Sequence, residues 1–132
     1  MSRAALLLTA LVGASGCFPA ADHRVIASPN ELMNLTTATN HSKTDRTKYL
    51  CIEFSVSDAS GNLMDKVQTS ASDVHKWAIG WFDDSTIVLS SSDIGACGWK
   101  LGEDGSISPL EHPISEELIE FGDLLKAAKY GN

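Results

Sequence analysis

The sequence has no apolar run long enough to cross a lipid bilayer. Its longest run, Ala4 to Val12, covers nine residues and is interrupted by Thr9, whereas a membrane-spanning helix needs about 20. Basic residues are also scarce, because only nine of the ten Lys and Arg remain beyond Arg3 to balance seventeen Asp and Glu. Phosphate binding rests on clustered cations, so we expect no nucleic-acid partner. An acidic chain leaves a basic protein partner open.

Sequence motifs for catalysis and cofactor binding are also missing. There is no glycine-rich phosphate loop and no dinucleotide fingerprint, and the four histidines lack the close spacing of a zinc site. We therefore expect no cofactor and no metal. The serines before Asp93 lack the Gly-x-Ser-x-Gly elbow of a serine hydrolase. A small periplasmic hydrolase that uses His75 with Ser92 or Asp93 remains an alternative, and it requires these side chains to meet in a cleft.

Cysteine is rare, and the first of the three cysteines, Cys17, ends an N-terminal segment with a recognisable layout. A basic start at Arg3 is followed by the apolar run and then by the small residues 13–16, as in a secretory signal. Ser15-Gly16-Cys17 resembles the processing site of bacterial lipoproteins. The resemblance covers residues 1–17 only. It implies a signal peptide over residues 1–16 and a lipid anchor on Cys17.

The lipoprotein resemblance also implies a place in the cell. A lipid on Cys17 would hold the protein at a membrane of the cell envelope. Phe18 follows the cysteine where the inner-membrane retention signal has aspartate, which favours the outer membrane. Ala14 and Gly16 also suit ordinary signal peptidase, so a secreted or periplasmic protein without lipid stays an alternative.

Two cysteines, Cys51 and Cys97, remain once Cys17 is assigned to the anchor. In an oxidising compartment we expect them to form a disulfide. Closing so long a loop would stabilise the domain by about 4 kcal/mol on the simple loop model.

The chain divides into a polar N-terminal part and a folded domain. Residues 18–48 contain few large apolar side chains and many Ser, Thr, Asn and Ala, which is typical of a tether. Ser28, Pro29 and Glu31 predict one short helix within it. We therefore expect an anchor and tether over residues 17–48 and a single domain over residues 49–132.

The domain is predicted to belong to the α+β class. Leu50 to Val56 alternates apolar and polar residues, as a half-buried strand does, and turn sequences such as Asp104-Gly105 separate further short strands. Ser115 to Gly131 predicts a helix, with Ser115 as N-cap and Gly131 as its stop. We expect a small twisted antiparallel meander of about five or six strands, from Tyr49 to Leu110, covered by this C-terminal helix.

Three tryptophans and three turn aspartates are the candidate binding residues. Tryptophan rings in a small sheet fill the core by default, and they form a binding surface only where a ring is exposed. We expect any partner to contact the sheet face opposite the helix, with one tryptophan as apolar anchor. The candidates are Asp83, Asp84, Asp93, Trp77, Trp81 and Trp99.

The leading functional hypothesis is a non-catalytic, membrane-anchored envelope lipoprotein that binds or supports another macromolecule. It combines the N-terminal signal, the tether and the absence of a catalytic motif. Beside the hydrolase, a second alternative is a secreted inhibitor or immunity protein, for which a small disulfide-linked acidic domain is suited.

Overall fold

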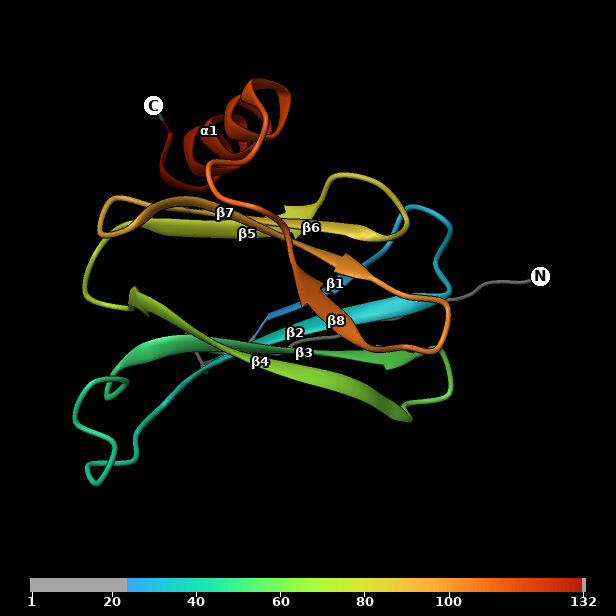
Figure 1. Ribbon diagram of the computed structural model, residues 1–132, viewed down its shortest axis with the longest axis horizontal. Coiled ribbons are helices and arrows are strands. Elements are labelled where there is room, and N and C mark those ends of the chain that lie inside the picture. The colour runs from blue at the N-terminus through green and yellow to red at the C-terminus, as the bar shows by residue number, and fades with distance from the viewer. Residues whose placement is uncertain (1–23, 132) are drawn as a thin grey trace.

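A helix and two antiparallel β-sheets form three stacked layers (Figure 1). The computed structural model describes residues 24–131. The first sheet has the order β1–β2–β3–β4 and the second has the order β5–β6–β7–β8. The elements are β1 (Arg24–Ala27), β2 (Met33–Thr39), β3 (Cys51–Asp58), β4 (Leu63–Ser72), β5 (Trp77–Trp81), β6 (Thr86–Ser91), β7 (Gly95–Leu101), β8 (Ile107–Pro109) and α1 (Glu116–Tyr130).

The predicted α+β class is confirmed, and so is the antiparallel meander covered by a C-terminal helix. Six strands, β3 to β8, lie between Tyr49 and Leu110, in agreement with the predicted five or six. The prediction of a single sheet is wrong, because the eight strands of the described region divide equally between two sheets. The division lies between β4 and β5, where the chain leaves the first sheet at Ser72 and enters the second at Trp77.

Strands β1 and β2 occupy part of the segment predicted to be a tether. The prediction of a tether is therefore wrong for the segment from Arg24 to Thr39. Residues 17–23 lie outside the described part of the chain. Along β2 the buried positions are Leu35, Thr37 and Thr39. Threonine is β-branched and suits a strand, but two threonines among three core positions hide the apolar alternation that sequence reasoning relies on.

The helix predicted at Ser28 is also wrong. Ser28 closes the turn between β1 and β2, where its N–H donates to the Met33 carbonyl at 2.9 Å and its own carbonyl accepts from Glu31 N–H at 2.8 Å. Glu31 has a φ of 63°, a left-handed conformation that cannot continue a right-handed helix.

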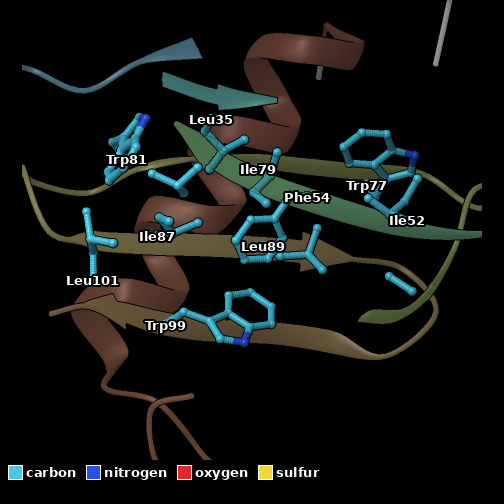
Figure 2. Packing of buried hydrophobic residues seen from close by; sticks show 12 residues of the cluster. Leu35, Ile52, Phe54, Trp77, Ile79, Trp81, Ile87, Leu89, Trp99 and Leu101 are labelled. Atoms are coloured by element: carbon cyan, nitrogen blue, oxygen red, sulfur yellow. The ribbon is translucent and has the colours of Figure 1, made fainter. Parts of the chain in front are cut away.

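The core fills the space between the two sheets with large apolar side chains from their inner faces (Figure 2). Phe54 of β3 is only 1% exposed, and its ring meets that of Trp99 on β7 edge to face, with 5.0 Å between ring centroids. Such a pair contributes about 0.5–1.5 kcal/mol beyond its buried area.

Helix α1 covers the outer face of the second sheet (Figure 1). Its predicted ends are confirmed, since Ser115 Oγ accepts from Leu118 N–H at 3.3 Å and Gly131 ends the helix with a φ of 78°. Gly122 lies so close to β6 that a Cβ there would stand 2.9 Å from the Ser90 Cβ.

The disulfide predicted between Cys51 and Cys97 is not present in this structure, in which both residues are free thiols. Ile52 on β3 points into the core, so the alternation of the strand turns Cys51 to the opposite face. Cys97 shares the inward face of β7 with Trp99 and packs against the core. The two thiols therefore lie on opposite sides of the first sheet. Burial raises the pKa of both thiols.

Candidate functional site

The three candidate tryptophans lie inside the molecule and fill the core. Trp77, Trp81 and Trp99 are 7%, 7% and 8% exposed. The indole N–H of Trp77 donates to Asp73 Oδ1 at 2.8 Å, and that of Trp81 donates to the Ile26 carbonyl at 2.9 Å. The default expectation that these rings form the core is confirmed, and the expectation of an exposed tryptophan anchor is wrong.

The sheet face predicted to bind a partner is not a surface. The face of the second sheet opposite α1 packs against the first sheet (Figure 1). The predicted placement of a binding site there is therefore wrong, because a second sheet covers the face that a single-sheet fold would expose.

Asp83 has a structural role in the turn between β5 and β6. Its Oδ1 accepts from Ser85 N–H at 3.0 Å. Partial burial raises the pKa of its carboxyl, but hydrogen bonds from Ser85 and Thr86 and the charge of Lys100 outweigh that effect and lower the pKa overall. The carboxylate stabilises its own turn.

Asp84 and Asp93 connect turns that are distant in the sequence. Asp84 Oδ1 accepts from Asn30 N–H at 2.8 Å, which joins the β5–β6 turn to the β1–β2 turn. Asp93 Oδ2 accepts from Ser72 N–H at 3.0 Å, which joins the β6–β7 turn to the end of β4. Both side chains are exposed, but each holds two parts of the fold together.

The residues of the hydrolase alternative are near one another in the fold without forming a catalytic arrangement. Ser92 Oγ accepts from Lys126 Nζ at 3.3 Å, and the Asp93 carboxylate binds the Ser72 amide. His75 is exposed on the loop between β4 and β5. Within the described residues, no hydrogen bond joins His75 to either partner. The same region holds no group of three His, Cys, Asp or Glu side chains placed to bind a metal.

A different feature stands out, a cavity of about 450 Å³ along the outer edge of β5. We call it the β5 groove. One side is formed by Ile26 of β1 and Pro29 of the β1–β2 turn, and the other by Leu125 and Ala128 of α1, with β5 residues 77–81 between them. Its volume falls in the range of about 300–1,000 Å³ that ligand sites occupy.

The backbone edge of β5 is open to a further strand. β5 pairs with β6 on one side and with no described strand on the other. Tyr130 Oη lies 3.1 Å from both N and O of Trp77, and Lys129 Nζ donates to the same carbonyl at 2.7 Å. Trp77 therefore turns its backbone groups away from β6. With the alternation of antiparallel strands, Ile79 and Trp81 do the same.

The outward N–H and C=O groups of Ile79 and Trp81 have no hydrogen-bond partner within the described residues. An unpaired strand edge of this kind is a template for pairing with another chain. Apolar walls on both sides would shield the added hydrogen bonds from water.

Two cations, Arg24 and Lys129, line the β5 groove. The Lys129 ammonium lies 3.5 Å from the centroid of the Trp77 ring. Burial lowers the pKa of Lys129, and the charge of Arg24 lowers it further, against opposing contributions from Tyr130 and Asp73. The Asp73 oxygens already accept from Trp77 and Thr39. Neither cation forms an ion pair with a described carboxylate, so an anion in the groove would be stabilised.

Sequence reasoning missed the β5 groove because its walls come from three distant segments. Gly80 was a partial signal, since a glycine inside a strand often marks a close approach, and a Cβ there would stand 3.0 Å from Leu125. Lys129 was recognisable only as a cation at a helix end. No protein-family model, curated protein or solved structure matches this chain.

Proposed function

We propose that this protein is a non-catalytic, lipid-anchored protein of the cell envelope that binds another protein by taking an extended segment into the β5 groove. The observation that carries the proposal is the open edge of β5 within an apolar groove. Main-chain hydrogen bonds to a sheet edge supply affinity in this mode of recognition, and flanking pockets select side chains.

The membrane anchor rests on the N-terminal sequence. Cys17 and the signal layout before it lie outside the described residues. Among the helices that the structure describes, none has the length and apolar character needed to span a membrane. Attachment would therefore come from the lipid on Cys17, and palmitate incorporation that disappears in Cys17→Ala tests it. Absence of label in the parent protein would contradict the anchor.

The binding role is tested by photo-crosslinking in the native membrane. A photoreactive residue at Ala27, which is exposed and lines the β5 groove, should crosslink to one partner protein. Leu124 is the matched control position, since it is exposed on α1 and does not line the groove.

A second substitution separates groove binding from incidental contact. Ala128→Trp places a large ring in the groove at an exposed helix position, so it should abolish the Ala27 crosslink while the domain stays folded. Leu124→Trp should leave the crosslink unchanged. A crosslink that survives Ala128→Trp, or that appears equally from Leu124, would contradict binding in the groove.

A further inference from the structure

We propose that the β5 groove binds the C-terminal end of the partner chain as an added antiparallel strand, with the terminal carboxylate held by Arg24 and Lys129. This inference rests on the proposed function, because it names the chemistry of the segment that the groove takes up. It follows from the position of the cations, the capped end of the β5 edge and the apolar walls.

The two cations stand at the same end of the β5 groove. The Ile26 carbonyl accepts a hydrogen bond from the Trp81 indole N–H, and Asn30 N–H donates to Asp84 Oδ1. Because both contacts follow the chain in the same order, β1 runs beside β5 in the same direction. Arg24, two residues before Ile26, therefore lies toward the beginning of β5. Lys129 also stands there, bonded to the Trp77 carbonyl.

The edge of β5 is already capped at that end. Trp77 N–H and C=O are bonded to Tyr130 and Lys129, so a strand that pairs with Ile79 and Trp81 cannot extend its ladder past Trp77. A ligand whose chain ends beside Trp77 fits the capped edge without a turn. A ligand bound through an internal segment would have to turn out of the groove at that point. A C-terminus beside the first residue of β5 also fixes the added strand as antiparallel to β5.

The walls of the groove set the side-chain preference of the ligand. Side chains of an added strand alternate between its two faces. One set would face Leu125 and Ala128 of α1, and the other would face Ile26 of β1 and Pro29 of the turn that follows it. Because both walls are apolar, we expect small or medium apolar side chains next to the terminal carboxylate.

A hexapeptide library made twice from the same sequences tests the inference on the full chain. One series ends in a free carboxylate and the other in an amide, and binding is measured by fluorescence polarisation. Because a hydrogen bond to a charged group contributes about 1.5–3 kcal/mol, we expect the amide forms of the binding sequences to bind at least about tenfold more weakly.

Charge reversal identifies the cations. Arg24→Glu should weaken the free-carboxylate series by about tenfold or more and leave the amide series nearly unchanged. Arg46→Glu is the matched control, because Arg46 is exposed and does not line the groove. Lys129→Met, which keeps the apolar stem over Trp77, should act in the same direction as Arg24→Glu.

The outcomes separate this inference from the proposed function. Equal binding of the acid and amide series, blocked by Ala128→Trp, would overturn the carboxylate site and leave strand addition intact. No binding by either series, or binding that Ala128→Trp does not block, would overturn both. Sodium hexanoate is the third probe, because it has a carboxylate and an apolar chain but no peptide group. Hexanoate binding as tight as the best peptide would make the occupant a small carboxylate and contradict the added strand.

Discussion

Tyr130→Phe is the most informative single substitution for the end of the β5 edge. The Tyr130 hydroxyl donates to the Trp77 carbonyl and accepts from Trp77 N–H, both at 3.1 Å. Without it, the carbonyl keeps its bond from Lys129 at 2.7 Å, while the N–H loses its acceptor. An orphaned buried donor costs about 1–3 kcal/mol. The site is only partly buried, so we expect a loss of about 1–2 kcal/mol.

The assay is urea unfolding followed by fluorescence of the buried tryptophans. In thermal unfolding of a domain of this size, a loss of about 1 kcal/mol would lower the melting temperature by about 4 °C. Tyr49→Phe is the control, because Tyr49 is 37% exposed and its substitution should change the free energy of unfolding by less than about 0.5 kcal/mol. If Tyr130→Phe is no more destabilising than Tyr49→Phe, the hydroxyl does not cap the edge of β5.

Three further predictions concern the fold. Gly122→Ala should destabilise the domain by about 1–2 kcal/mol in urea unfolding, although alanine favours helices, because the new Cβ would crowd β6; a more stable variant would contradict that packing. The pKa of Asp65 is lowered, first by the hydrogen bond from Ile107 N–H at 2.7 Å. Its stabilisation is therefore present at neutral pH and lost as pH falls below about 4, so Asp65→Asn should lose less stability under acid than the parent, as measured by unfolding at each pH. Alkylation in denaturant without reductant should label both Cys51 and Cys97 in the mass spectrum; a mass lower by two hydrogen atoms, with neither cysteine labelled, would show that the disulfide forms.

The parts of the fold that the sequence predicted are those in which apolar residues carry the pattern. Leu50 to Val56 alternates large apolar residues and contains most of β3, and the serine cap and glycine stop define α1. Strand β2 escaped prediction because threonines fill two of its core positions. The prediction of a helix at Ser28 failed because the residues that suit a helix start also suit a tight turn.

The candidate site was harder to predict than the fold, for a topological reason. The aspartates and tryptophans were correctly predicted as turn and strand residues. The presence of two sheets, which the sequence did not predict, determines which of these side chains are exposed to solvent. The β5 groove needs β1, β5 and α1 at once. Arg24 and Lys129 are 105 positions apart in the sequence, and no spacing rule joins them.

Amide hydrogen exchange at Ile79 and Trp81 tests the central claim most directly. In the free protein these outward N–H groups have no strand partner, so they should exchange faster than those of Ala78 and Gly80, which face β6. A bound free-carboxylate peptide should slow exchange at Ile79 and Trp81 and leave Ala78 and Gly80 nearly unchanged. Exchange at Ile79 and Trp81 that is the same with and without bound peptide would contradict strand addition at β5.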